Sequence, residues 1–329
     1  TQEQKKYLLC TQHRSLLYII LHFGNGVMLL PQLRAFCLTL GLYSNGQAVN
    51  RAVRELREAD ILNRQTWIDS NSDLVLCRKY VYCFFTGKAR EEVATPRRPN
   101  TMAPYILQAR KIDWLLLIME KNHLTTLESV EKYLLAHGCT VFLRLPDLLA
   151  YYEQCAPILA QVYPSRFQEQ TEQLRAGMEQ RSRLARGEPI APLPALPPEP
   201  VATLEKTHRR GLYISGIYPQ QKTVCFALFA GREATAQKVM DWVIDAHSWV
   251  ISLLPDYNTI LYVYALDANH EEALKSVLTA VAPKSEQTPY YRYRLEGRKF
   301  AGRVRLGIID SHFVTRWCGG VCRTHSDRH

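Results

Sequence analysis

Polar side chains recur on one side of the segment that follows Ser44, and their types could hydrogen-bond the edges of nucleic-acid bases. They are Gln47, Asn50, Arg51 and Arg54, with Arg57 or Glu58 completing the row. Gln, Asn and Arg are the side chains that reach adenine and guanine edges in the major groove. The apolar residues between them recur at helical spacing, and they are Ala48, Val49, Ala52, Val53 and Leu56. The pattern therefore predicts an amphipathic helix with a buried stripe and a basic, polar outer face.

Two further helices are predicted before this one. Thr11–Phe23 carries apolar residues at helical spacing and ends at Gly24-Asn25-Gly26. Pro31–Leu40 has proline in its first turn, where the missing N–H costs nothing, and Gly41 stops it. Ser44 and Gln47 then stand at capping-box spacing, which predicts that the third helix starts at Asn45.

A β-hairpin is predicted directly after the third helix. Ile61–Ile68 reads as one strand, and Leu74–Phe85 reads as a second strand. The turn between them, Asp69–Asp73, contains two carboxylates that would repel phosphate, so flanking arginines would have to make any contact there. Three helices followed by a hairpin is the element order of a winged helix.

Residues 11–86 resemble a winged helix-turn-helix domain, and the stretch from Asn50 to Leu62 is similar to a recognition helix and its exit into the wing. More loosely, the arrangement is similar to the replication-relaxation proteins of plasmids and conjugative elements in Gram-positive bacteria. The resemblance implies that the third helix enters the major groove while the wing follows phosphate or the minor groove. On that mapping, Gln47, Asn50, Arg51 and Arg54 meet bases or phosphates. The wing-side phosphate contacts are Arg64, Arg78 and Lys79.

The charge of the chain is concentrated near its beginning. The 329 residues carry a net charge of +10, and residues 1–100 hold 14 basic against 8 acidic side chains. Nine cysteines, mostly within apolar stretches, are typical of reduced thiols. The sequence contains neither an uncharged apolar run of about 18 residues nor a charged-then-apolar leader, so we expect a cytoplasmic protein without a membrane partner.

Two proline-containing linkers divide the chain into several segments. Residues 86–103 and the stretch Gly187–Pro200, which holds six of the seventeen prolines, favour extended spacers. We therefore predict a multi-domain α+β protein. Its parts are a winged-helix domain (1–88), a helical segment (104–186), a proline-rich linker (187–203), an α/β domain (204–317) and a tail (318–329).

The C-terminal segment alternates strand and helix patterns. The predicted strands are 212–218, 223–230, 259–266, 290–295 and 303–310, and the predicted helices are 233–250 and 270–281. The order ββαβαββ is that of an α/β domain. The sequence does not reveal the order of the strands within the sheet.

Patterns typical of enzymes are weak. There is no Gly-Lys-Ser/Thr phosphate loop and no Gly-x-Gly-x-x-Gly turn. Gly216-Ile217-Tyr218 matches only the first half of a nuclease signature, and Asp241 and Asp245 are typical of the wet face of a helix. We expect no enzyme activity and no cofactor. The tail leaves open whether four residues bind a metal, namely Cys318, Cys322, His325 and His329.

These observations predict a double-stranded DNA-binding protein that regulates transcription, or assists replication or transfer, of a mobile genetic element. A homodimer is expected, with Ser165–Arg186 as one candidate contact, because DNA half-sites mirror protein symmetry. Two alternatives stay open. The winged helix could bind protein as an adaptor, or the C-terminal domain could process nucleic acid.

Overall fold

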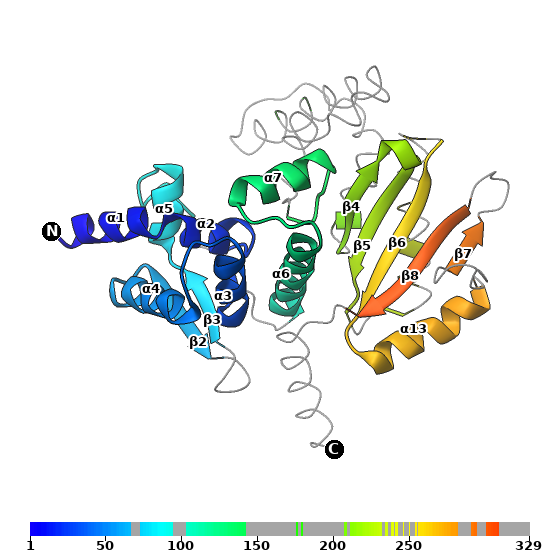
Figure 1. Ribbon diagram of the computed structural model, residues 1–329, viewed down its shortest axis with the longest axis horizontal. Helices are drawn as coiled ribbons and strands as arrows, with labels where there is room; N and C mark the ends of the chain where they lie inside the picture. Colours follow the sequence, from blue (N-terminus) through cyan, green and yellow to red (C-terminus); the bar gives the residue numbers. More distant parts are fainter. Residues whose placement is uncertain are drawn as a thin grey trace, which may run out of the picture. The chain divides into compact units, whose positions relative to one another are not determined.

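The protein is a mixture of helices and two β-sheets arranged in two compact units (Figure 1). A computed structural model describes residues 1–66, 73–94, 103–142, 211–231, 256–281, 291–294 and 301–308, with isolated positions between 176 and 254. The first unit includes residues 1–130, and the second includes residues 131–308. The chain passes from one to the other within the helix Leu127–Ala136, α7.

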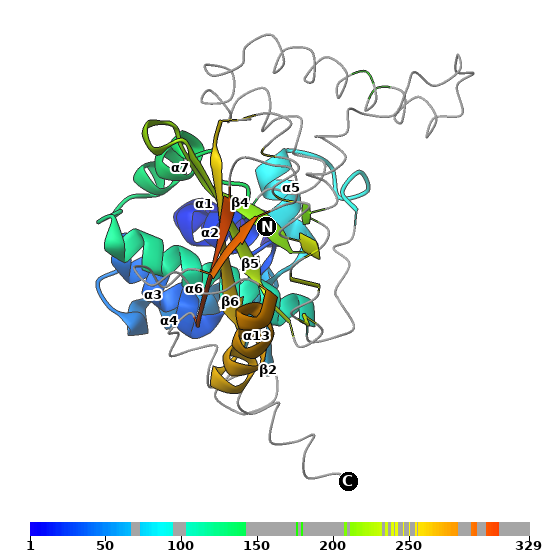
Figure 2. The ribbon, with the colours of Figure 1, turned by 90° about the vertical axis from the view of Figure 1, so that its right-hand side faces the viewer.

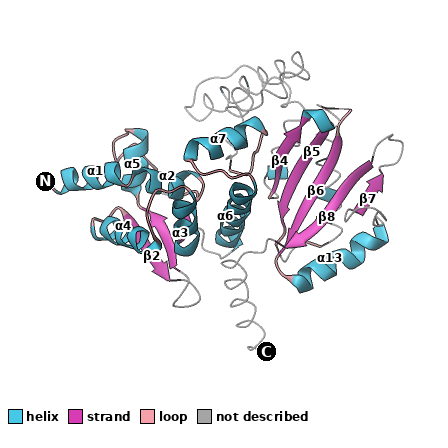
Figure 3. Ribbon diagram, in the orientation of Figure 1, coloured by secondary structure: helices cyan, strands magenta, loops and turns pink. Residues whose placement is uncertain are grey.

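Helices surround a small antiparallel sheet in the first unit (Figure 3). The helices are α1 (Gln2–Gln12), α2 (Arg14–His22), α3 (Leu30–Thr39), α4 (Gly46–Glu58), α5 (Lys79–Thr86) and α6 (Ala103–Lys121). The strands are β1 (Val27–Leu29), β2 (Leu62–Thr66) and β3 (Asp73–Cys77). The central strand β3 pairs with β1 and β2, with Leu62 opposite Cys77 and Thr66 opposite Asp73.

The first predicted helix, Thr11–Phe23, is present mainly as α2, because a break at His13 leaves Thr11 and Gln12 at the end of α1. His13 has φ −106° and ψ 27°, outside helical geometry, and it separates α1 from α2. Its imidazole is buried, and Nδ1 lies 2.9 Å from the hydroxyl of Tyr43. Burial raises the pKa of Tyr43 above its ordinary value. The long-range bond holds the break in place.

The second predicted helix is confirmed as α3, with proline in its first turn. Gly41 ends it at φ +62°, a left-handed conformation that favours glycine. The amide of Gly41 donates to the carbonyl of Leu38, and the amide of Leu42 donates to that of Cys37, each at 3.0 Å. These two bonds are the Schellman pattern, which fixes the direction of the chain toward α4.

The predicted strand Leu74–Phe85 is wrong in its second half. The strand β3 ends at Cys77, and Lys79–Thr86 forms α5 despite its aromatic and β-branched composition. Cys77 pairs with Leu62, the first residue of β2, so a longer β3 would have no partner strand on that side. In the helix, the ring of Phe84 contacts that of Tyr7, and the ring of Phe85 contacts that of Tyr18.

Helix α6 packs on other helices of the first unit. The buried Gln32 side chain of α3 donates from Nε2 to the carbonyl of Ala109 at 2.7 Å and to Oδ1 of Asp113 at 2.8 Å. Gln108 of α6 donates to the carbonyl of Phe23. The sequence prediction placed α6 in a separate helical segment, whereas these bonds join it to α2 and α3.

The second unit contains a five-stranded mixed sheet in the order β4-β5-β6-β8-β7. The strands are β4 (Leu212–Tyr218), β5 (Thr223–Phe229), β6 (Asn258–Ala265), β7 (Tyr291–Arg294) and β8 (Ala301–Ile308). The strands β5, β6 and β8 are parallel, while the outer strands β4 and β7 are antiparallel to their neighbours. Helix α13 (Ala268–Val281) packs along β6, β8 and β7 (Figure 2). The predicted strands and the helix 270–281 are confirmed.

The residues after α7 cover the outer edge of β4. The amide of Thr140 donates to the carbonyl of Ile214 at 2.8 Å, and the amide of Ile217 donates to the carbonyl of His137 at 2.9 Å. The hydroxyl of Thr140 also accepts from the amide of Ile214 and lies 2.9 Å from Nε2 of His208. These bonds occupy outward backbone groups of Ile214 and Ile217, so this part of the edge is closed to another strand.

Candidate nucleic-acid interface

Helix α4 begins with a side-chain cap. Asn45 has extended backbone geometry, and its Oδ1 accepts a hydrogen bond from the amide of Ala48 at 2.9 Å. The helix starts at Gly46, one residue later than predicted, because its cap is Asn45 and not the predicted Ser44. Asparagine is among the best capping residues, and its side chain caps the amide of Ala48, one residue beyond the Gln47 amide that a cap at Ser44 would satisfy.

The inner face of α4 is the predicted apolar stripe. Val49, Ala52, Val53 and Leu56 are buried, and Ala48 is half-buried. Helix α4 packs against α3 and β2. At its start, a Cβ on Gly46 would lie 3.3 Å from Cδ of Arg34, so glycine permits α3 and α4 to approach closely. Because this stripe is buried, the opposite, polar face of α4 points to solvent.

The structure brings the predicted base-contacting residues together on the outer face of α4. The exposed side chains there are Gln47, Asn50, Arg51, Arg54, Arg57 and Glu58. Among the residues that the structure describes, none forms an ion pair with Arg51, Arg54 or Arg57. Figure 1 shows α4 along the margin of the first unit, beside β2. The outer face of α4 therefore carries three arginines without an ion pair to any described residue, against one carboxylate, that of Glu58.

A carboxylate on the flank of α4 is held away from this face. Oε2 of Glu55 lies 3.5 Å from Nε2 of the buried His13. The same imidazole contacts Tyr43 through Nδ1. Glu55 thus lies toward α1 and α2, where it does not pair with the arginines.

The wing-side arginines are placed differently from those of α4. Arg64 of β2 is exposed but donates to the carboxylate of Asp73, and this bond raises the pKa of the guanidinium. Arg78, just after β3, lies 2.5 Å from Oδ1 of Asp60. Both guanidiniums are already paired, so contact with phosphate would have to compete with a carboxylate. The tip of the hairpin, residues 67–72, lies outside the described residues.

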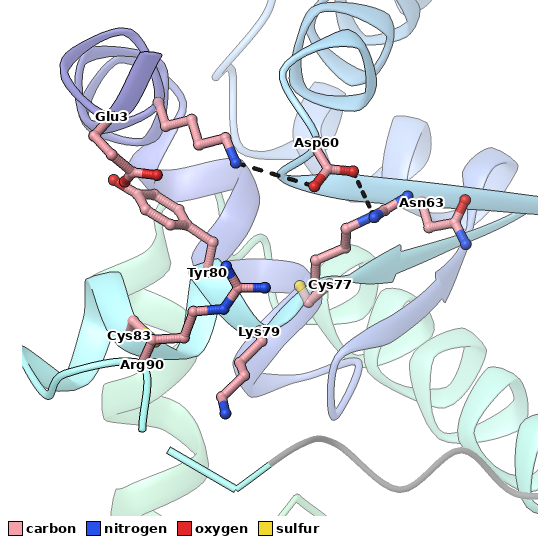
Figure 4. A pocket seen from close by; sticks show the side chains of 10 residues that line it. Glu3, Asp60, Asn63, Cys77, Lys79, Tyr80, Cys83 and Arg90 are labelled. Atoms are coloured by element: carbon pink, nitrogen blue, oxygen red, sulfur yellow. Dashed lines mark ion pairs between the residues drawn. The ribbon is translucent and has the colours of Figure 1, made fainter. Parts of the chain in front are cut away.

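Lys79 lines a hollow between α1, the turn after α4 and the start of α5 (Figure 4). We call it the α1–α5 hollow, and it has a volume of about 800 Å³. Four cationic side chains line it, namely Lys6, Arg78, Lys79 and Arg90. Of the eight predicted site residues, Arg78 and Lys79 therefore lie here, while Gln47, Asn50, Arg51, Arg54 and Arg57 share the outer face of α4.

Sequence reasoning missed Lys6 and Arg90. Lys6 is on α1, which was not predicted, although Thr1 and Gln4 stand at capping-box spacing. The box forms, with the amide of Gln4 donating to Oγ1 of Thr1 at 3.3 Å. That signal could have revealed α1 and its lysine. No local pattern marks Arg90, which follows α5 in the sequence and meets Lys6 only through the fold.

Other candidates from the sequence do not assemble into a site within the described residues. No group of three or more potential metal ligands occurs there. Gly216-Ile217-Tyr218 lies on β4, and Asp241 is exposed, whereas Asp245 and the tail residues Cys318, Cys322, His325 and His329 lie outside the described part. The predicted dimer contact, Ser165–Arg186, lies outside it as well, except for Ala176 and Glu179.

Hydropathy and comparison with known proteins add two findings. In the described parts of the chain, no helix combines the length and apolarity needed to cross a bilayer. No protein-family model, curated protein or solved structure matches the chain.

Proposed function

We propose that the first unit binds double-stranded DNA through the outer face of α4, as a winged helix-turn-helix. The observation that carries this proposal is the row of unpaired Arg51, Arg54 and Arg57 beside Gln47 and Asn50 on one exposed helix face. Arginine binds guanine and phosphate, and glutamine and asparagine bind adenine, so this face carries both kinds of contact that DNA recognition requires.

The element order supports the proposal. Along the chain, α2, β1, α3, α4, β2 and β3 follow the order of a winged helix, with α3 and α4 as the helix-turn-helix pair. The Schellman turn at Gly41 and the cap at Asn45 fix both ends of the connection between the pair. A helix held in this way can present its side chains to the major groove with little loss of entropy on binding.

In the cell, we propose that this DNA binding serves a regulator or accessory factor for transcription, replication or transfer of a mobile genetic element. The resemblance of residues 11–86 to replication-relaxation proteins supports this role. The second unit, with its mixed sheet, then supplies contacts to a partner or to a second copy of the chain. The part of the protein that contacts DNA is the first unit alone.

The salt dependence of duplex binding tests the proposal. The full chain should bind members of a random duplex library, and log K should fall linearly with log salt, with a slope of about −3.5 to −5.5 for about four to six phosphate contacts. Saturable duplex binding that is insensitive to salt would contradict a contact made by arginines. At 50 mM salt, charge contacts bind at least about tenfold more tightly than at 200 mM salt. Absence of duplex binding even at 50 mM salt would favour a protein-binding adaptor.

A further inference from the structure

The α1–α5 hollow is a second charged feature of the first unit, distinct from the outer face of α4. We propose that it binds a small molecule that carries a phosphate monoester and sugar hydroxyls, such as a nucleotide or a sugar phosphate. Its volume, about 800 Å³, lies within the range of small-molecule pockets. The hollow is built from three separate stretches of chain, residues 3–6, 60–63 and 77–90.

The charge of the hollow favours a phosphate. Lys6, Arg78, Lys79 and Arg90 face two carboxylates, those of Glu3 and Asp60, which leaves two positive charges in excess. A phosphate monoester carries about −1.5 to −2 charges near pH 7, so one such group would balance the excess. A carboxylate, with a single charge, would leave the hollow positive.

Two of the four cations are free to make this contact. Asp60 holds the other two, with Oδ1 at 2.5 Å from Arg78 and Oδ2 at 4.0 Å from Lys6 (Figure 4). Lys79 and Arg90 have no ion pair with any residue that the structure describes. Their charges are therefore the ones that an arriving anion meets without displacing a carboxylate.

The start of α5 adds positive potential at the same place. Arg78 is the residue before the first turn of α5 and Lys79 is its first helical residue, with no acidic side chain in that turn and no side-chain cap. Cations at the positive end of a helix dipole are unfavourable, whereas an anion there is stabilised. A bound phosphate would thus relieve an unfavourable arrangement that the folded chain otherwise retains.

The remaining polar groups suit hydroxyl donors. The carboxylates of Glu3 and Asp60 and the side-chain amide of Asn63 supply hydrogen-bond acceptors around the hollow. Oδ1 of Asn63 already accepts from the amide of Arg64, but an amide oxygen has a second lone pair. The ring of Tyr80 provides an apolar wall, with Nζ of Lys6 lying 5.5 Å from its centroid. A ligand with one phosphate and several hydroxyls matches this combination.

Calorimetric titration of the full chain with four probes tests the proposal. Adenosine 5′-monophosphate and ribose 5-phosphate should bind saturably with Kd below about 1 mM, whereas adenosine and inorganic phosphate should bind at least about tenfold more weakly. Equal binding of adenosine and its monophosphate would overturn the assignment of a phosphate. Failure of both phosphorylated probes to saturate would overturn the proposal as a whole.

A pair of double variants locates the site. Lys79→Ala/Arg90→Ala should weaken both phosphorylated probes at least about tenfold, because the two unpaired cations are lost. The control Arg51→Ala/Arg54→Ala removes the same charge from α4 and should leave probe binding unchanged. If the two double variants bind the probes alike, the hollow is not the site.

Duplex DNA distinguishes a small ligand from a DNA phosphate. DNA should not displace the bound monophosphate, and Lys79→Ala/Arg90→Ala should change duplex affinity much less than probe affinity. Displacement by DNA, together with an equal loss of duplex affinity in that variant, would make the hollow a DNA-backbone contact and the small-ligand proposal wrong. This outcome is independent of whether α4 reads DNA.

Discussion

Gln32 of α3 and Asp113 of α6 form a buried hydrogen bond, with 2.8 Å between Nε2 and Oδ1. The glutamine is fully buried, and the aspartate is 4% exposed. The same Nε2 also donates to the carbonyl of Ala109. One side-chain amide of α3 thus fixes α6 to the helix that precedes the candidate interface on α4.

Replacing this glutamine should loosen α6. Gln32→Leu removes the donor and leaves a buried carboxylate with one partner fewer, so we expect the first unit to lose about 1.5–3 kcal/mol in its free energy of unfolding. Gln65→Leu, the same change at an exposed position of β2, should cost less than about 0.5 kcal/mol. Amide hydrogen exchange of α3 and α6 in the full chain measures the loss of stability in each of the two variants. Equal protection in the two variants would show that the bond contributes little.

The two neighbouring candidates for the cap of α4 make a matched test. Asn45→Ala should destabilise the start of the helix by about 1 kcal/mol, because the amide of Ala48 loses its acceptor. Ser44→Ala should change the stability by less than about 0.5 kcal/mol. Exchange rates of the amides at residues 47–49 report the effect. A larger change in these exchange rates for Ser44→Ala than for Asn45→Ala would show that Ser44 is the cap, as the sequence predicted.

Buried thiols should make the protein sensitive to alkali. Burial raises the pKa of Cys37 to about 12 and that of Cys10 to about 11. In the unfolded chain these thiols ionise near pH 8.5, so the folded state binds more protons above that pH. The stability that they contribute is therefore present below about pH 8.5 and is lost as pH rises toward 11.

Replacing one of these thiols tests whether its raised pKa causes the loss of stability at high pH. The free energy of unfolding of the first unit, measured in urea between pH 8 and pH 10.5, should fall with rising pH. Cys37→Ala should reduce the slope by up to about 1.4 kcal/mol per pH unit, even if the variant is less stable throughout. Parallel slopes for the variant and the natural sequence would contradict the raised pKa.

The elements that the sequence predicted correctly have strong local signals. The apolar stripe of α4, the proline in the first turn of α3 and the stop at Gly41 define these helices without help from distant residues. The strands β4, β5 and β6 have alternating or continuous apolar residues bounded by turns. Local patterns of this kind determine which element forms, and the structure places these elements within one or two residues of their predicted bounds.

The features that sequence reasoning missed depend on partners far along the chain. Lys79–Thr86 has strand-like composition, but β2 starts opposite Cys77 and offers no further pairing, so the segment becomes a helix. The bond from Gln32 to Asp113 spans 81 positions, and nothing local indicates that α6 belongs with α3. The α1–α5 hollow likewise combines cations whose positions in the sequence run from 6 to 90. Such arrangements follow from packing, which a single sequence does not display.

The ion pair between Arg64 and Asp73 predicts that Arg64 contributes less to duplex affinity than the arginines of α4 do. Arg64 donates to the carboxylate of Asp73, so a DNA phosphate would have to displace that carboxylate before it could contact Arg64. We expect Arg64→Ala to lower duplex affinity by less than about threefold, compared with about tenfold or more for Arg54→Ala. Fluorescence anisotropy with one labelled duplex compares the two. A greater loss for Arg64→Ala would place the main contact on the hairpin.

Duplex affinity of the double variant Arg51→Ala/Arg54→Ala tests the central proposal most directly. Its matched control is Lys88→Ala/Lys121→Ala, which removes two charges from exposed positions of the first unit, after α5 and at the end of α6. On a duplex selected by the natural protein, the α4 variant should bind at least about tenfold more weakly and show a salt slope smaller by about 2, and the control should bind within about threefold of the natural protein. Equal affinity of the α4 variant and the natural protein for that duplex would contradict DNA recognition by this helix.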